Sequence, residues 1–240
     1  MKILYDLHTH TRYSDGRSSV EDNIKRAKEL GLEKLAITDH GHGKWTSKKI
    51  KPKFYKQAKD EIKKYSAQYG LLCLFGIEAN VIGMDGEIDI TKGELKELDI
   101  LLCGVHRKVC PKNLKTLLCF FLPNWLGIKS KKQIERNTRT VINVLEKNKI
   151  DILTHPGRYF PVDIMAIAKK CAEVGTLFEL GRKEIPFSPQ QFNEMQKIEG
   201  LQFIINSDAH GAEKIGQIKK VEEFLKLCEY KKEKIINLAD

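Results

Sequence analysis

The chain has 240 residues, of which 41% are hydrophobic and 31% are charged, and its formal net charge is +10 at pH 7. This composition is typical of a soluble globular protein and excludes a fibrous or low-complexity chain. The longest apolar run, residues 117–128, is too short to cross a bilayer and no signal-peptide pattern follows Met1, so we expect a cytoplasmic protein without a membrane partner.

Strand-like and helix-like segments alternate along the first half of the chain. A strand is predicted at 2–8, followed by a helix over 18–31 in which Ser18 and Glu21 have capping-box spacing. Further strands are predicted at 34–40, 71–82 and 98–106, with helices at 52–69 and 131–147. The helix at 131–147 is expected to turn Ile134, Val141 and Leu145 inward.

The same alternation continues to the end of the chain. Strands are predicted at 151–155, 176–180 and 201–210, and helices at 163–175, 188–200 and near 219–237. Gly175 is expected to end one helix, and Ser188 with Pro189 to begin the next. Seven apolar strands alternating with helices predict an α/β protein whose parallel sheet forms a closed or nearly closed barrel, as a single domain over 1–240.

Histidines and carboxylates cluster at the predicted strand ends. The histidines are His8, His10, His40, His106, His155 and His210, and the carboxylates are Asp39, Glu78 and Asp208, with Asp15 in the loop after the first strand. Because all strands of a parallel barrel open their carboxyl ends on one face, these side chains are expected to converge. Imidazole and carboxylate donors suit zinc, iron or manganese, and their number suits two or three divalent ions. Clustered ions of this kind indicate hydrolysis, most naturally of a phosphate ester.

Two other compositional features bear on function. The six cysteines form no C-x-x-C pair, and we expect buried, reduced thiols. Positive charge is concentrated in two segments: 44–64 holds nine lysines against two acidic residues, and 107–139 holds nine basic residues against one. Such segments either steer an anionic substrate or nucleic acid, or form solvated helix faces.

Six motifs resemble those of the polymerase and histidinol phosphatase (PHP) family. They are DLHTHTRYSDG, ITDHG, GIEAN, GVH, THPGRY and NSDAHG, in that order, over roughly residues 3–215. The resemblance, which is greatest to the stand-alone phosphoesterases, implies a distorted (β/α)7 TIM-like barrel with a trinuclear metal centre. It assigns His8, His10, Glu78 and Asp208 to one ion, Glu78, His106 and His155 to a second, and Asp15, His40 and His210 to the third.

On this resemblance we expect a metal-bridging hydroxide, held by Glu78, Asp208 and His8, to attack phosphorus. Arg107, Arg158 and Arg182 are expected to bind the substrate phosphate, although each could instead form loop salt bridges. His42 is either a further substrate-binding residue or an exposed loop histidine. Glu179, at the end of the sixth strand, either orients a ligand imidazole or lies elsewhere.

The leading functional hypothesis is a metal-dependent phosphatase for a small phosphorylated substrate, with histidinol phosphate and nucleotides as candidates. A nuclease or phosphodiesterase acting on nucleic-acid ends is the first alternative, since the two basic segments favour it. A non-catalytic metal-binding regulatory module is the second. The apolar segment 117–128 is interpreted either as core or as an aromatic flap over the metals.

Overall fold

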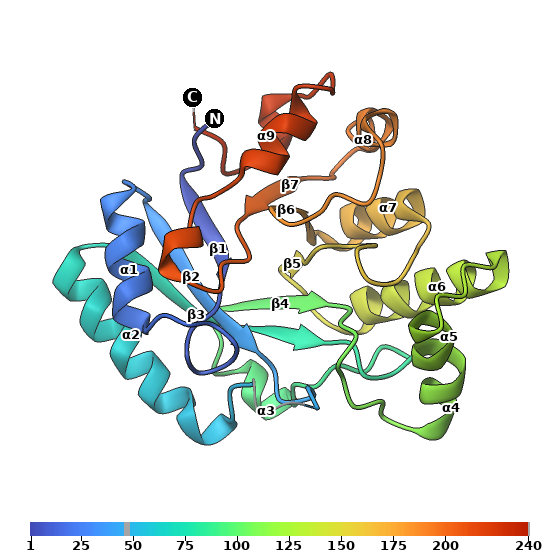
Figure 1. The fold of residues 1–240 in the computed structure, drawn as a ribbon, viewed down its shortest axis with the longest axis horizontal. Helices are drawn as coiled ribbons and strands as arrows, with labels where there is room; N and C mark the ends of the chain where they lie inside the picture. Colours follow the sequence, from blue (N-terminus) through green and yellow to red (C-terminus); the bar gives the residue numbers. More distant parts are fainter. Residues whose placement is uncertain (46–48, 240) are drawn as a thin grey trace.

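The structure is a computed structural model that describes residues 1–45 and 49–239. Lys48 of the first basic segment therefore lies outside the described residues. One sheet of seven parallel strands runs in sequence order through the molecule, and helices surround it (Figure 1). The strands are β1 Tyr5–Thr9, β2 Lys34–His40, β3 Leu72–Asn80, β4 Ile100–Gly104, β5 Ile152–Leu153, β6 Leu177–Gly181 and β7 Phe203–Asn206.

The sheet curls into a nearly closed barrel, as the strand and helix pattern predicts. Between β1 and β7 there is no regular ladder within the described residues, only the bridge Thr9–Ala209, where the His10 backbone N–H donates to the Ala209 carbonyl at 2.8 Å. Side chains extend this closure, because Asn206 Oδ1 accepts from the Leu7 N–H at 2.9 Å. The barrel is therefore closed by a mixture of backbone and side-chain hydrogen bonds.

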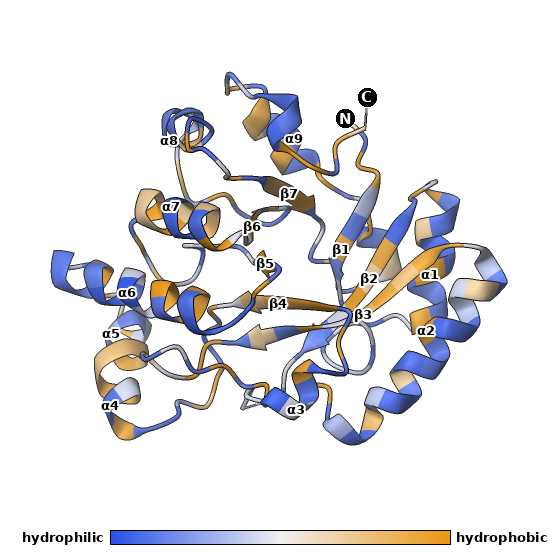
Figure 2. Ribbon diagram, turned by 180° about the vertical axis from the view of Figure 1, so that it is seen from behind, coloured by the Kyte–Doolittle hydropathy of each residue, from blue (hydrophilic) through white to orange (hydrophobic). Residues whose placement is uncertain are grey.

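The helices lie outside the strands, and Figure 2 shows their polar residues on the outer surface and the apolar strands within. Their bounds are α1 Val20–Glu29, α2 Tyr55–Tyr69, α3 Lys92–Leu95, α4 Leu114–Thr116, α5 Leu122–Trp125, α6 Lys131–Lys147, α7 Ile164–Val174, α8 Pro189–Met195 and α9 Lys219–Leu225. Short 3-10 turns lie at Pro52–Phe54, Ala212–Lys214 and Lys232–Lys234, and a π-helical turn at Leu117–Phe121 joins α4 to α5.

Side chains alternate along each strand between the helix layer and the barrel interior. The larger apolar cluster packs the sheet against the helices, whereas a smaller one contains Ala36, Leu102, Ile152 and Ile204. Ala36, on β2, is followed at every second position by Thr38 and His40. These three side chains therefore lie on one side of the strand. One end of the barrel interior is thus apolar and the other polar.

Several predicted helix ends are confirmed. Helix α6 has the predicted bounds, and Val141 and Leu145 are buried while Ile134 is only partly so. Gly175 ends α7 in the left-handed conformation, which glycine adopts without strain. Ser188 caps α8 with Pro189 as its first residue. The capping box of α1 is shifted by one residue from the prediction, because Ser19 and Asp22 form it.

The prediction of a helix extending to 237 is wrong. Helix α9 ends at Leu225, and the segment after the 3-10 turn runs along the barrel instead, with bridges Phe203–Ile235 and Ile3–Leu238. The chain leaves the helix because Asn237 is fully buried and its amide group bonds backbone atoms of Tyr5 and Ile205. The two termini consequently lie side by side in Figure 1.

The apolar segment 117–128 has one buried and one exposed face. Phe120 and Phe121 are fully buried, whereas Leu118 and Leu126 are exposed. The six cysteines are all free, but the prediction that they are buried holds fully for two of them, Cys103 and Cys171. Three others are half-buried, and Cys110 is exposed because it lies in the loop after β4. Among the described residues, no helix combines the length and the apolar character that crossing a membrane requires.

Candidate metal centre

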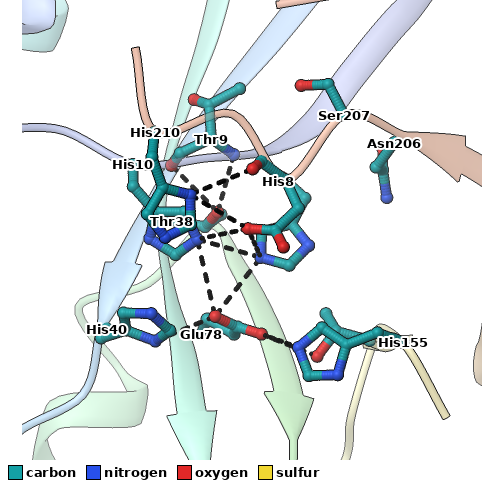
Figure 3. Close-up of polar contacts among 12 residues, drawn as sticks. His8, Thr9, His10, Thr38, His40, Glu78, His155, Asn206, Ser207 and His210 are labelled. Carbon is teal, nitrogen blue, oxygen red and sulfur yellow. Dashed lines mark hydrogen bonds and ion pairs between the residues drawn. The ribbon is translucent and has the colours of Figure 1, made fainter. Parts of the chain in front are cut away.

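The nine side chains predicted as metal ligands meet at the polar end of the barrel. Figure 3 shows six of them, with Glu78 at the centre of the dashed contacts. His8 lies in β1, His40 ends β2 and Glu78 lies in β3, while the remaining ligands follow the ends of β1, β4, β5 and β7 within a few residues. Their convergence is a consequence of the parallel barrel, whose strands all end on this face.

His8, His10 and Glu78 form one cluster of donor atoms, and Asp208 lies beside its two imidazoles. His8 Nε2 lies 3.3 Å from Glu78 Oε2 and 3.8 Å from Asp208 Oδ1. His10 Nε2 lies 3.2 Å from His8 Nε2, 3.6 Å from Glu78 Oε2 and 3.3 Å from Asp208 Oδ1. Four ligands bound tetrahedrally at zinc distances stand about 3.3–3.6 Å apart. The cluster of His8, His10 and Glu78 therefore fits one small divalent ion, with Asp208 next to it.

The two oxygens of Glu78 face different partners. Oε2 belongs to the set above, whereas Oε1 lies 3.2 Å from His106 Nε2 and 2.9 Å from His155 Nε2. His40 adds its Nδ1, 2.9 Å from Oε2. A carboxylate with donors on both sides has the arrangement needed to bridge two ions.

Asp15 organises a third group of donors. Its Oδ1 lies 3.3 Å from His210 Nε2, 3.5 Å from His40 Nε2 and 4.0 Å from His10 Nδ1. These four residues form one of the clusters whose donor atoms all lie within 4.8 Å of one another. Three imidazoles and a carboxylate suit zinc, iron or manganese.

Unpaired polar atoms support metal binding at this site. Hydrogen-bond partners are absent, within the described part of the chain, for the buried atoms His10 Nδ1, His40 Nδ1, His106 Nδ1, Asp15 Oδ1 and Glu78 Oε2. Buried polar atoms without partners are costly, and groups in this state indicate a missing ion or ligand. The donors therefore fit divalent ions.

Ionisation at the site also favours a cation. Burial lowers the pKa of His106 to about 3, and burial with repulsion from His40 lowers the pKa of His10 well below its ordinary value. Although burial favours the protonated carboxyl, neighbouring imidazoles, His106 first, hold the pKa of Glu78 well below its ordinary value. Neutral imidazoles and ionised carboxylates are the forms that bind metals.

Two predicted ligands have strained backbones. His155 has φ +33° and Asp208 has φ +47°, and these are the non-glycine residues with positive φ in the described chain. Each costs about 1–3 kcal/mol relative to a relaxed conformation, so the surrounding structure must impose it. Such strain commonly accompanies functional sites, where it aims a side chain that a relaxed turn would not.

Glu179 supports this geometry from β6, which settles the alternatives for its position. Its Oε1 lies 2.8 Å from His8 Nδ1 and accepts from Asn206 Nδ2 at 3.0 Å, while Oε2 accepts from the His155 N–H at 2.8 Å. A carboxylate on the second nitrogen of a ligand imidazole fixes the ring orientation and tautomer. Burial disfavours charge on His8, yet Glu179, Glu78 and Asp208 raise its pKa well above the ordinary value.

The loop that carries Asp15 is held by a second buried carboxylate. Asp39 accepts from the Thr11 N–H at 2.8 Å, from Thr11 Oγ1 at 2.5 Å and from Ser14 Oγ. Thus Asp39, which stands at a strand end beside His40, holds the loop rather than joining the cluster of donors.

Cationic side chains surround the donors, and two of them were not predicted. Lys183 Nζ lies 2.6 Å from Asp208 Oδ2, and Arg158 Nη1 lies 3.6 Å from the same oxygen. On the opposite side, Lys44 Nζ lies 3.2 Å from Asp15 Oδ2. Lys183 directly follows Arg182 at the end of β6, so its place at a strand end is the signal that could have identified it.

The other predicted phosphate-binding residues lie differently. Arg182 donates its Nε to the Ser207 carbonyl at 2.8 Å. Arg107 is exposed in the loop after β4, and His42 Nδ1 lies 3.5 Å from Glu94 Oε1. Of the predicted arginines, Arg158 is the one in direct contact with a predicted metal ligand.

Comparisons with known proteins agree with the fold and the motifs. The PHP domain family model matches residues 6–239. A probable phosphatase of Shewanella sediminis is 31% identical over 99% of this chain and 90% of its own length, and one of Acetivibrio thermocellus is 29% identical over 100% and 92%.

A solved structure shares the fold. The histidinol phosphate phosphatase of Lactococcus lactis superposes with a TM-score of 0.67 at 13% identity, covering 95% of this chain and 94% of the other. At that identity the likeness concerns the fold alone. The family model and the curated relatives extend over almost the whole chain, and we conclude that it belongs to the PHP family.

Proposed function

We propose that the protein is a metal-dependent phosphatase that hydrolyses small phosphomonoesters at a trinuclear centre. The observation that carries the proposal is the position of Glu78, whose two oxygens lie between separate groups of imidazoles. Family membership supports phosphoesterase chemistry, and the curated relatives are called probable phosphatases.

Three groups of residues are proposed to hold two to three divalent ions, which are zinc, manganese or iron. The groups are His8, His10, Glu78 and Asp208; Glu78, His106 and His155; and Asp15, His40 and His210. When bound, such ions supply a hydroxide nucleophile at neutral pH and neutralise charge on the phosphate. Glu179 keeps the His8 ring oriented for this task.

Arg158 and Lys183 are proposed to bind the substrate phosphate. Both lie against Asp208 Oδ2, on the oxygen that is not shared with His10. With a cation held at Asp208, Arg158 and Lys183 would have donors available for phosphate oxygens, and the guanidinium could bond two of them. Because Arg182 donates to a backbone carbonyl, we assign the second cationic role to Lys183.

The experiment is a hydrolysis screen of purified protein with zinc, manganese and iron(II) restored separately. Small phosphomonoesters are compared with phosphodiesters and with single-stranded DNA ends, including histidinol phosphate because the Lactococcus lactis structure contains zinc, L-histidinol and phosphate. We expect metal-dependent release of phosphate from monoesters. Preferential, salt-sensitive cleavage of DNA would support the nuclease alternative.

A pair of variants tests the role of the donors. Glu78→Gln is expected to lower kcat by more than about 100-fold, because the bridging charge is lost. The control Glu146→Gln removes a carboxylate that pairs with Lys170 on the outside of the barrel and is expected to retain activity. Full metal content without hydrolysis of any ester would instead identify a regulatory module.

A further inference from the structure

A cavity lies beside the predicted metal centre. It has a volume of about 350 Å³ and is lined by Arg107, Lys129, Arg158 and Tyr159 with apolar residues and Glu184. Two of these residues also border the centre, because Arg158 lies beside Asp208 and the Tyr159 ring lies 5.4 Å from the His155 ring and 5.9 Å from the His106 ring. Arg158 and Tyr159 therefore place this cavity beside the centre.

The charge of the cavity is strongly positive. Three of its side chains are cationic and one, Glu184, is acidic. Glu184 is itself 59% exposed and lies 3.9 Å from Arg158 Nε, a weak pairing. Arg107 and Lys129 have no ion-pair partner among the described residues. These two cations are thus available to an anion.

The remaining wall is apolar. It is formed by Pro161, Val162, Ile164 and Pro186. Such a surface suits the carbon skeleton of a substrate and offers no ligands for a metal ion. The cavity therefore combines an apolar wall with a cationic rim.

The backbone of Arg107 and the side chain of Arg158 are anchored next to the centre. Arg107 directly follows the predicted ligand His106, and its carbonyl accepts from Trp125 Nε1 at 3.0 Å. The Arg158 guanidinium stacks over the Tyr159 ring at 4.8 Å. A substrate whose second anionic group reaches these cations can therefore be distinguished from one that lacks it.

We propose that the natural substrate carries a second anionic group, a carboxylate or a further phosphate, which Arg107 and Lys129 bind in this cavity. The proposal rests on the proposed phosphatase function and narrows its substrate class. A leaving group with an amine, such as histidinol, brings positive charge to a cationic cavity and is disfavoured.

Matched phosphomonoesters test this proposal through activity. Glycerol 3-phosphate is compared with 3-phosphoglycerate, and fructose 6-phosphate with fructose 1,6-bisphosphate, so that each pair differs in one anionic group. We expect at least one member with two anionic groups to have a kcat/KM about tenfold above its partner, the value of one charge-assisted hydrogen bond. The preference should shrink at high salt, because exposed cations are screened.

Substitutions locate the second anionic group. Arg107→Gln and Lys129→Gln are each expected to raise KM for the preferred substrate several-fold with kcat retained. The KM for the partner that carries only the phosphate group is expected to stay the same. Lys132→Gln removes a neighbouring exposed lysine that does not line the cavity, and it is the matched control.

A binding measurement provides a readout independent of turnover. Isothermal titration compares 3-phosphonopropionate with propylphosphonate, which have the same chain length and differ in one carboxylate. Tighter binding of the former, lost in Arg107→Gln, is expected. Equal hydrolysis and equal binding within every pair would overturn this inference and leave the phosphatase function intact, whereas no hydrolysis of any monoester would contradict the function itself.

Discussion

At the scale of single residues, Glu179 shows how one buried carboxylate organises several functional groups. It contacts the His8 ring, the Asn206 amide and the backbone N–H of His155, so it fixes atoms from three strand ends. These contacts use His8 Nδ1 and the backbone of His155, and they leave the Nε2 atoms of both imidazoles free to act as metal ligands. Its effect on the centre is therefore one of positioning.

Glu179→Gln is expected to weaken metal binding about 10–100-fold, because the amide lacks the charge that orients and polarises His8. The measurement is the zinc dissociation constant by competition with a chromogenic chelator. Glu194→Gln, which changes a carboxylate in an exposed ion pair with Lys197, is the control. Unchanged zinc affinity in folded Glu179→Gln would contradict the positioning role.

A second prediction at this scale concerns Lys183. Lys183→Gln is expected to lower kcat/KM for phosphomonoesters about tenfold, because one charge-assisted hydrogen bond to the phosphate is lost. Metal content, measured by elemental analysis, should stay the same. Lys214→Gln serves as the control, and equal activity of the two variants would remove Lys183 from the proposed phosphate site.

At the scale of elements, the segment after α9 completes the barrel where β1 and β7 lack a regular ladder. Asn237 Nδ2 donates to the Tyr5 carbonyl at 2.8 Å and to the Ile205 carbonyl at 2.7 Å, and Oδ1 accepts from the Ile205 N–H at 3.0 Å. A single amide side chain thus replaces part of a strand pairing.

Asn237→Ala is expected to reduce the free energy of unfolding by about 2–4 kcal/mol, since three hydrogen bonds are lost and buried backbone groups are left unpaired. Urea unfolding followed by circular dichroism measures this change. Asn193→Ala removes one hydrogen bond, from the Glu229 N–H, at a less buried position and should cost far less. Similar losses for the two variants would show that Asn237 does not help close the barrel.

At the scale of the whole molecule, the predicted metal ligands come from six of the seven strands or the loops that follow them, and the seventh, β6, contributes Glu179. Ions bound at this end would therefore link six strands directly and the seventh through the contact of Glu179 with His8. Because the unfolded chain lacks the assembled site, binding free energy adds to the stability of the fold.

Removal of metal by a chelator is expected to lower Tm by about 5–10 °C, the effect of a ligand at about 100 times its Kd on a chain of this size. Differential scanning calorimetry with and without restored zinc measures it, and Glu78→Gln should show a smaller difference. Equal Tm values for chelated and zinc-restored wild-type protein would mean that bound ions do not link the strands.

The same binding should depend on pH. His8 has a pKa raised well above its ordinary value, so in the metal-free protein the stabilising ion pairs of its protonated form are present at low pH and lost as pH rises through that pKa. A metal ion must displace this proton. Zinc binding should therefore release protons and strengthen as pH rises, which titration in buffers of different ionisation enthalpy detects. Zinc affinity that does not change with pH would contradict this linkage.

Much of the fold follows from local patterns in the chain. Strand-like runs ending in histidine or acidic residues, capping residues such as Ser188 and the terminating Gly175 depend on neighbours within a few positions, and these predictions are confirmed. The residues proposed as ligands were also predictable, because a parallel barrel brings the ends of its strands together whatever the details of packing.

Long-range contacts decided what those patterns left open. The helix pattern near 219–237 is overridden by the buried bonds of Asn237 with β1 and β7, which lie about two hundred and thirty and about thirty residues away. The contacts of Glu179 with His8, and of Lys183 with Asp208, join strands that local spacing does not relate. The sequence by itself therefore determined the barrel and the circle of side chains proposed to bind metal, whereas tertiary packing decided how each is oriented and which cations lie beside them, because these depend on distances between strands.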